Sequence, residues 1–482
     1  MNQEVAALNP TEIWTCFEEL NSVPRPSKKE ERVIAFMKKF GEDLGLETIV
    51  DPVGNVIIRK PATAGKEAVT PMVLQGHLDM VHQKNSATEF DFDNQGIESW
   101  IDGDWVKAKG TTLGADNGIG SASIMAVLKS ESIAHGPIEG LFTIDEETGM
   151  TGAKHLQEGL LQGKILLNTD TEDEGELCIG CAGGVDSTAQ WTYAQQDNSL
   201  PAYQLSVTGL RGGHSGCDIH LGRGNANKLM NRVLFQLNRA VPIRIASLAG
   251  GSLRNAIPRE SFAVITFEDD QEDAVRETLA KLAAEIQTER KTSEPGLKID
   301  LKPTDNVTQV MTETDQVTLL NLVYASPNGV DRMSEDIADL VETSTNLSKI
   351  EVADGEASFQ FLTRSSVETA REELAQSIQS IFELAGARVE HGGRYPGWKP
   401  NAESKILEQM KSVYQELFGK TPTVNAVHAG LECGIIGSHY PGMDMISFGP
   451  TIKNPHSPDE KCHIESVGLY WKYLIAVLES IK

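Results

Sequence analysis

The stretch Met72-Val-Leu-Gln-Gly-His-Leu-Asp-Met80 places an apolar run directly before a His-x-Asp pair. The apolar residues 72–74 predict a short buried strand, and His77 and Asp79 then lie at its carboxyl end. Side chains two residues apart on a strand point to the same side, so the imidazole and the carboxyl group can meet. Ligands collect at this edge of α/β sheets, which makes the pair a candidate metal site in which Asp79 orients His77. A polar pair without a metal is the alternative.

Three further apolar runs, at residues 56–58, 141–144 and 165–167, are also short and flanked by Gly, Pro or polar residues. Helix-length segments such as 118–129 separate them. Ser27 and Glu30 form a capping box that predicts the start of an earlier helix, which Gly45 would end. This alternation predicts an α/β domain in which a mostly parallel central sheet is covered by helices.

Length and charge exclude several classes of protein. The 482 residues exceed what one hydrophobic core usually organises, and they predict two or three domains. With 69 acidic against 43 basic residues, the formal charge of −26 repels a phosphate backbone and argues against nucleic-acid binding. No apolar run approaches the ~20 residues that a membrane span needs. The first residues show no basic segment followed by an apolar one, so we expect a cytoplasmic protein without membrane contact.

From about residue 202 the pattern changes to alternating strands, such as 204–207 and 262–267, mixed with amphipathic helices near 226–237 and 272–288. A Gly- and Pro-rich stretch at 392–400 ends this region. Helix and strand patterns then resume at 405–418, 423–427, 445–448 and 465–481. The chain thus contains a second domain, and the pattern alone leaves open whether the residues after 400 return to the first domain or form a third.

Carboxyl groups follow other predicted elements of the first domain. Glu146 and Glu147 end the strand at 141–144, and Asp170 follows the strand at 165–167. Asp116 lies in the stretch 110–120, whose four glycines allow a tight turn before a helix. Each residue has a simpler explanation. For Glu146 and Glu147 it is a solvated acidic strand end, and for the residues around Asp170 it is a solvated loop. For Asp116 it is a helix N-cap.

His456 stands between two prolines in the loop 454–460. Taken alone, it is explained equally well as a turn residue. Together with His77 and the carboxyl groups at the strand ends, it completes a set of nitrogen and oxygen donors suited to two zinc-like ions. This set favours the return of the end of the chain to the first domain.

Seven motifs, spread over nearly the whole chain, carry a family resemblance. They are GHLDMV (76–81), GTTLGADNGIG (110–120), DEETGMTGA (145–153), NTDTEDEGE (168–176), CAGG (181–184), GLRGGHSG (209–216) and PHSPDEK (455–461). In this order they resemble the motifs of the M20 metallopeptidase clan, most closely those of its bacterial aminoacyl-histidine dipeptidases.

The resemblance implies a ligand set for two ions. His77 and Asp170 would hold one ion, Glu147 and His456 would hold the other, and Asp116 would bridge both.

The resemblance also implies a general base. Glu146 would take this role, and Asp79 would orient the imidazole of His77. Because Asp145 directly precedes the two glutamates, a shift of these roles by one residue stays open.

Three residues of the second domain, and His428 beyond it, match the family. His214 in GGHSG would help to stabilise the oxyanion of the tetrahedral intermediate. Asn255 and Arg364 would hold the C-terminal carboxylate of the substrate. His428 would line the pocket near the domain junction. A glycine-turn histidine and a surface ion pair are the simpler explanations for His214 and Arg364.

The implied architecture is a catalytic domain formed by residues 1–185 and 395–482, with an inserted α+β lid and dimerisation domain at 186–394. The implied activity is hydrolysis of unblocked dipeptides, preferentially Xaa-His as in carnosine, with Cys-Gly as a further candidate. Two divalent metal ions, zinc or else cobalt or manganese, and a homodimer are expected. The alternatives are an amidohydrolase acting on N-acyl amino acids and a catalytically silent binding protein with the same fold.

Overall fold

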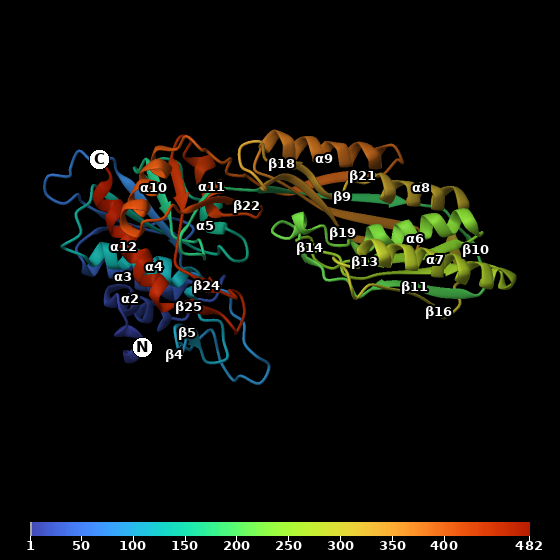
Figure 1. Ribbon diagram of the computed structural model, residues 1–482, viewed down its shortest axis with the longest axis horizontal. Coiled ribbons are helices and arrows are strands. Elements are labelled where there is room, and N and C mark those ends of the chain that lie inside the picture. Colours follow the sequence, from blue (N-terminus) through green and yellow to red (C-terminus); the bar gives the residue numbers. More distant parts are fainter. Residues whose placement is uncertain (1) are drawn as a thin grey trace. The chain divides into compact units, whose positions relative to one another are not determined.

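The computed structural model describes residues 2–482 and divides the chain into two compact units (Figure 1). The first unit contains the residues up to Gly180 together with Trp398–Ala426 and Leu431–Lys482. The second contains Cys181–Gly397 and the short segment Val427–Gly430. The end of the chain therefore returns to the first unit, and the boundaries lie a few residues from those expected at 185 and 395. Within residues 2–482, no helix has both the length and the apolar character needed to cross a membrane.

The first unit is built on an eight-stranded mixed sheet. In spatial order its strands are β1 (Glu47–Val50), β2 (Val56–Lys60), β6 (Ile138–Thr143), β3 (Met72–His77), β7 (Ile165–Asn168), β23 (Asp444–Ser447), β8 (Glu176–Cys181) and β22 (Thr423–Val427). The four central strands β6, β3, β7 and β23 are parallel, whereas β1, β2 and β8 pair antiparallel. The predicted α/β class is confirmed, with parallel pairing confined to the centre of the sheet, where β3 and β6 are buried along their whole length.

The helices of the first unit are α1 (Gln3–Ala6), α2 (Thr11–Asn21), α3 (Glu31–Asp43), α4 (Ala115–Lys129), α5 (Thr151–Lys154), α10 (Lys405–Phe418), α11 (Glu432–His439) and α12 (Ile464–Ser480). Helix α4 is buried along most of its length and contacts both α2 and β3. Its first turn is thereby held close to the sheet edge at which β3 ends.

The predicted capping box at the start of α3 is wrong. The helix begins at Glu31, and no side chain caps it. The hydroxyl of Ser27 donates instead to Asp79, and the carboxyl group of Glu30 accepts from the backbone N–H groups of Lys28 and Asp145. The two side chains thus form hydrogen bonds with the loops that follow β3 and β6 rather than with the first turn of α3. Gly45 does follow the end of α3 in a left-handed conformation, as predicted.

A second, smaller sheet of the first unit presents the loop that carries His456. Its strands, in spatial order, are β24 (Ile452–Lys453), β25 (Lys461–His463), β5 (Trp105–Ala108) and β4 (Ser99–Asp102). Because β24 and β25 pair antiparallel, residues 454–460 form the loop of a hairpin. The pairing of β25 with β5 anchors this hairpin to the segment that leads into α4.

The second unit is an antiparallel sheet with helices packed on it, as expected for an α+β domain (Figure 1). Its main sheet has the order β16 (Lys298–Pro303), β11 (Ala202–Thr208), β15 (Ser261–Thr266), β13 (Arg244–Gly250), β19 (Val341–Ala353), β20 (Glu356–Ser365), β9 (Gly183–Thr192) and β21 (Arg388–Tyr395), and β18 (Gly329–Met333) also pairs with β19. Its helices are α6 (Ala226–Ala240), α7 (Glu272–Arg290), α8 (Glu313–Ala325) and α9 (Glu368–Glu383), with short 3₁₀ turns at Ile219–Leu221 and Asp269–Gln271. Two short pairs, β10 (Gln195–Asp197) with β17 (Gln309–Met311) and β12 (Gly213–His214) with β14 (Ala256–Ile257), complete it.

Candidate metal centre

The candidate ligands converge on one edge of the first unit because they follow neighbouring parallel strands. His77 is the last residue of β3, and Glu147 and Asp170 come shortly after the adjacent strands β6 and β7. Parallel strands end at the same edge of a sheet, so these side chains meet there. Asp116 comes from the first turn of α4, and His456 from the hairpin loop between β24 and β25.

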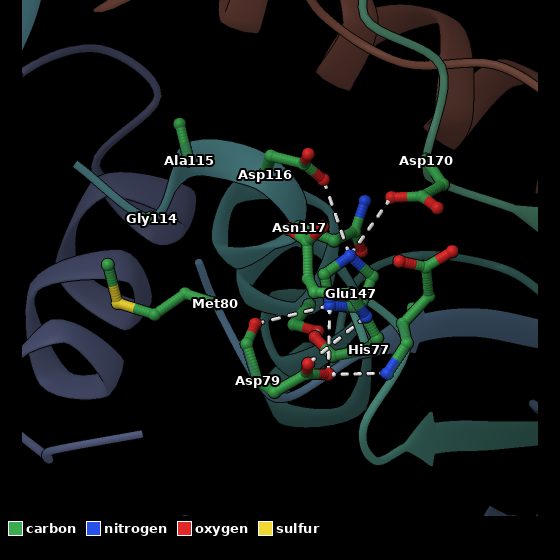
Figure 2. Close-up of polar contacts among 12 residues, drawn as sticks. His77, Asp79, Met80, Gly114, Ala115, Asp116, Asn117, Glu147 and Asp170 are labelled. Carbon is green, nitrogen blue, oxygen red and sulfur yellow. Dashed lines mark hydrogen bonds and ion pairs between the residues drawn. The ribbon is translucent and has the colours of Figure 1, made fainter. Parts of the chain in front are cut away.

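His77 forms the centre of a first cluster (Figure 2). Its Nε2 atom lies 3.3 Å from Oδ1 of Asp116 and 3.4 Å from Oδ1 of Asp170. The three ligand atoms lie within 4.8 Å of one another, and the imidazole is 1% exposed. We refer to His77, Asp116 and Asp170 as the inner triad.

A second cluster shares Asp116 with the first. Nε2 of His456 lies 3.2 Å from Oδ2 of Asp116 and 2.9 Å from Oε2 of Glu147. The side chain of His456 is 54% exposed, so this cluster opens to solvent. We refer to Asp116, Glu147 and His456 as the outer triad. The two triads contact different oxygens of Asp116, which is the arrangement that a bridging carboxylate requires.

Asp79 organises the residues around the inner triad. Its carboxyl group is fully buried and lies 3.3 Å from Nδ1 of His77, on the opposite side of the ring from Asp116 and Asp170 (Figure 2). The same carboxyl group accepts hydrogen bonds from the backbone N–H groups of Glu146 at 3.0 Å and Glu147 at 3.3 Å. One side chain therefore fixes both the imidazole and the turn that carries the two glutamates.

Asp145 belongs to neither triad. Its φ of +52° turns the chain, and its carboxyl oxygens accept hydrogen bonds from the hydroxyl groups of Thr148 and Thr151. Glu146 and Glu147 are the neighbours whose carboxyl oxygens lie close to His77. The geometry thus favours the assignment of the base and ligand roles to this pair over the assignment shifted by one residue.

The excess of carboxyl groups controls protonation at the site. Burial alone would lower the pKa of His77, but the carboxylates of Asp170 and Asp116 outweigh burial and hold it well above its usual value. Hydrogen bonds to Asp116 and Glu147 raise the pKa of His456 to about 11, against the effect of partial burial. Protons on the two imidazoles thus compensate for negative charge in the metal-free protein, and a cation would replace them.

Glu146 is a buried acid surrounded by other carboxyl groups. Burial raises its pKa well above the usual range, and the negative charges of Asp170, Glu432 and Glu147 raise it further, whereas His77 opposes the shift. A buried carboxyl group with a high proton affinity is suited to accept and return a proton during catalysis.

The residues fit a pair of divalent cations. Two buried carboxylate oxygens have no hydrogen bond within residues 2–482: Oε1 of Glu147, and Oδ1 of Asp170, which is in ion-pair contact with Nε2 of His77 at 3.4 Å. One belongs to each triad, and an imidazole joins the carboxylates in both. Mixed nitrogen and oxygen donors of this kind suit zinc, cobalt or manganese.

Three buried side chains near the centre have no counterpart in the sequence prediction. The carboxyl group of Glu432 accepts from Thr143 and Gln75 beneath the site, and burial raises its pKa to about 7. Arg25 and Glu460 bind the backbone around the start of α4. Burial raises the pKa of Glu460 to about 7, although backbone N–H donors oppose this shift. Glu460 lies within the PHSPDEK motif, but neither its spacing nor the pattern around Arg25 predicts a partner elsewhere in the chain.

His214, Asn255 and Arg364 lie together within the second unit, and so does His428, which the expected boundary at 395 had placed in the catalytic domain. The strand pairing of β12 with β14 sets His214 opposite Ala256, next to Asn255. Nη2 of Arg364 lies 3.5 Å from Nε2 of His214. Arg364 is paired across β19 and β20 with Ser344, whose hydroxyl group bonds to Nε2 of His428 at 2.7 Å. Arg364 is buried, which excludes the simpler explanation of a surface ion pair.

The environment of His214 defines its tautomer. Burial and the adjacent guanidinium of Arg364 lower its pKa to about 4, so the ring is neutral at physiological pH. Its Nδ1 atom accepts hydrogen bonds from the backbone N–H groups of Gly216 and Cys217, at 3.1 and 3.0 Å. The proton of the neutral ring therefore resides on Nε2, which is available as a hydrogen-bond donor.

Comparison with known proteins identifies the family of the chain. The cytosol non-specific dipeptidase of Escherichia coli (strain K12) is 44% identical over 482 residues, which cover 99% of each chain. The crystal structure of aminoacylhistidine dipeptidase from Vibrio alginolyticus has a TM-score of 0.92 and 45% identity, over 99% of this chain and 98% of that chain. Aminopeptidase PepT from Bacillus cereus, with a TM-score of 0.58 and 18% identity over 98% of this chain and 99% of that one, shares the fold. Residues 73–480 match the model of peptidase family M20/M25/M40, and the chain belongs to this family, as its motifs predicted.

Proposed function

We propose that this protein is a dinuclear metal-dependent dipeptidase that hydrolyses unblocked dipeptides, preferentially Xaa-His. The observation that carries the proposal is the pair of triads that share Asp116 through different oxygens. In this proposal His77 and Asp170 hold one divalent cation, Glu147 and His456 hold the second, and Asp116 bridges them. Zinc is the proposed metal, with cobalt and manganese as the alternatives.

Glu146 acts as general base in this proposal. Bound divalent cations supply Lewis acidity, which polarises the scissile carbonyl group and makes water more acidic. The carboxylate of Glu146 takes the proton of the attacking water and then gives it to the leaving amine nitrogen. Asp79 holds both His77 and the backbone of Glu146, so it keeps the base and a ligand in a fixed relation.

The residues of the second unit bind the substrate in this proposal, in which that unit acts as a lid. His214 donates from Nε2 to the developing oxyanion, which its neutral tautomer permits. Asn255 and Arg364 hold the C-terminal carboxylate, and His428 lines the pocket beside them. Nε of Arg364 is buried without a hydrogen-bond partner inside residues 2–482, which supports a role in contacting a polar ligand.

The names of the relatives support the substrate class. The Escherichia coli protein is a non-specific dipeptidase and the Vibrio alginolyticus protein an aminoacylhistidine dipeptidase. The Escherichia coli protein is named a cytosol dipeptidase, which supports the proposed cytoplasmic location. A homodimer formed through the second unit is proposed from the family resemblance. Measurement of the molar mass in solution by light scattering tests it.

A hydrolysis panel tests the function. Metal-free protein, reconstituted with zinc, cobalt or manganese, is assayed on carnosine, a second Xaa-His dipeptide, cysteinylglycine and an N-acetyl amino acid. We expect metal-dependent release of histidine from the Xaa-His substrates and little cleavage of the blocked compound. Preferential cleavage of the N-acetyl amino acid would favour the amidohydrolase. Cleavage of none of these compounds, with any of the three metals, would favour a silent binding protein.

A further inference from the structure

The carboxyl group of Glu460 is bound by four consecutive backbone N–H groups. Its Oε2 atom accepts from Leu113 at 2.7 Å and Gly114 at 2.9 Å, and its Oε1 atom accepts from Ala115 at 2.8 Å and Asp116 at 3.2 Å. The side chain is 2% exposed. Because the N-cap residue of α4 is a glycine, the helix has no cap of its own, and a carboxyl group from the far end of the chain takes that place.

This contact joins two of the three segments that carry the outer triad. Glu460 lies in the hairpin loop of His456, and its backbone N–H bonds to Ser457 at 3.0 Å. Its side chain ends on the backbone N–H of Asp116. A displacement of either loop therefore changes the distance between Nε2 of His456 and Oδ2 of Asp116, which is 3.2 Å in the structure.

Arg25 holds the same turn from its other side. Its buried guanidinium donates to the carbonyl oxygen of Gly114 at 2.6 Å and to the carbonyl oxygens of Leu78 and Asp79 at 3.1 Å each. The turn before Asp116 is thereby tied to the residues that follow His77. A Cβ at Gly114 would lie 2.6 Å from a guanidinium nitrogen, so the glycine leaves room for this contact.

We propose that Glu460 is a positioning residue of the metal centre. It fixes the distance between the bridging Asp116 and His456, and Arg25 holds the same turn from the other side. Glu460 makes no contact with a metal-ligating side chain, so it acts through the backbone of the segment that carries Asp116. The inference rests on the proposed function, since it assumes that the triads bind cations. Loss of a group that orients a metal ligand typically lowers metal affinity 10- to 100-fold.

Zinc titration of the metal-free protein tests the proposal. Glu460→Gln keeps the shape of the side chain but replaces one acceptor oxygen by an amide that cannot accept from the N–H groups. We expect wild-type protein to bind two zinc ions, and Glu460→Gln to bind the weaker of them at least tenfold less tightly. Competition with a chromophoric chelator measures both affinities without any assay of activity.

Glu18 provides a matched control. Its carboxyl group is equally buried in the first unit and accepts from the backbone N–H of Asn2 and the hydroxyl group of Ser99, away from both triads. Glu18→Gln should lower the melting temperature of the metal-free protein to a similar degree as Glu460→Gln and leave both zinc affinities within threefold of wild type.

Two outcomes would overturn different conclusions. Zinc affinities of Glu460→Gln within threefold of wild type, or a parallel loss in Glu18→Gln, would refute the positioning role. A wild-type protein that binds no zinc would instead refute the proposed function. If Glu460→Gln does not fold, Glu460→Asp, which keeps the charge but is one methylene shorter, takes its place, and unchanged zinc affinities in that variant would refute the role.

Discussion

Replacement of Glu146 by Gln should remove most of the turnover while the metal centre stays intact. The amide keeps the shape of the side chain, and the backbone N–H of residue 146 can still donate to Asp79. Glu146 belongs to neither triad, so both cation sites keep all their ligands. The substitution also removes one of several crowded carboxyl groups around His77, and the metal-free protein should be no less stable than wild type.

The expected loss follows from the role of a general base. Proton transfer by a positioned side chain contributes about 10²- to 10⁴-fold to the rate, or roughly 3–5 kcal/mol of transition-state stabilisation. With zinc-loaded enzyme and a saturating Xaa-His dipeptide, kcat should fall by this factor, and KM should change little because the side chain makes no proposed contact with the ground-state substrate. Metal analysis of the same sample should still give two ions per chain.

Asp145→Asn is the control for the neighbouring acid. Its carboxyl group bonds to Thr148 and Thr151 and not to the triads, so the variant should lose about 1–3 kcal/mol of stability and keep kcat within about tenfold of wild type. If Glu146→Gln keeps more than a tenth of the wild-type kcat at full metal content, another group accepts the proton. A selective loss of kcat in Asp145→Asn would move the base role to that residue.

Three further substitutions test the site and its surroundings. Asp116→Ala removes the carboxylate common to both triads, so metal analysis after gel filtration should find at most one zinc ion per chain instead of two. Gly114→Ala should lower the free energy of unfolding by about 1–3 kcal/mol in urea titrations, because φ is +69° and the new Cβ would press on Arg25. In the second unit, hydrogen bonds from Arg394 hold the pKa of Glu372 at about 2, below its ordinary 4.5. The contribution of this carboxylate to the free energy of unfolding is therefore complete above pH 4.5 and is lost as the pH falls towards 2. Glu372→Gln should remove about 1 kcal/mol near pH 7 and nothing near pH 2, the value being small because solvent screens this partly exposed carboxyl group.

The sequence predicted the strands that carry the ligands because each is a short apolar run with a polar residue at its end. The runs at 72–74, 141–144 and 165–167 correspond to β3, β6 and β7, which lie side by side and parallel. Parallel neighbours end at one edge, so the positions of His77, Glu147 and Asp170 follow from periodicity and topology together. That His456 joins this edge was predicted from the kind of donor set that two cations would require, with one imidazole for each.

Contacts that depend on tertiary structure could not be predicted in the same way. Ser27 and Glu30 have the spacing of a capping box, yet a buried carboxyl group and a backbone N–H elsewhere in the fold bind them instead. The pattern of residues 427–430 gives no sign that they belong with the second unit. Local spacing specifies which groups a residue can reach within its own helix or turn, whereas these partners are chosen by packing between segments far apart in the sequence.

The two triads have different structural support, and this difference has a consequence for metal binding. The inner triad takes His77 and Asp170 from adjacent strands of the main sheet, where strand pairing and burial fix both. The outer triad takes His456 from a hairpin loop that the pairing of β25 with β5 anchors only at its base, and that side chain is 54% exposed. Within this loop the carboxyl group of Glu460 is the contact that reaches the backbone of Asp116. The cation affinity of the outer triad therefore depends more strongly on residues outside the ligand set, and the weaker of the two bound ions should be the one held by His456.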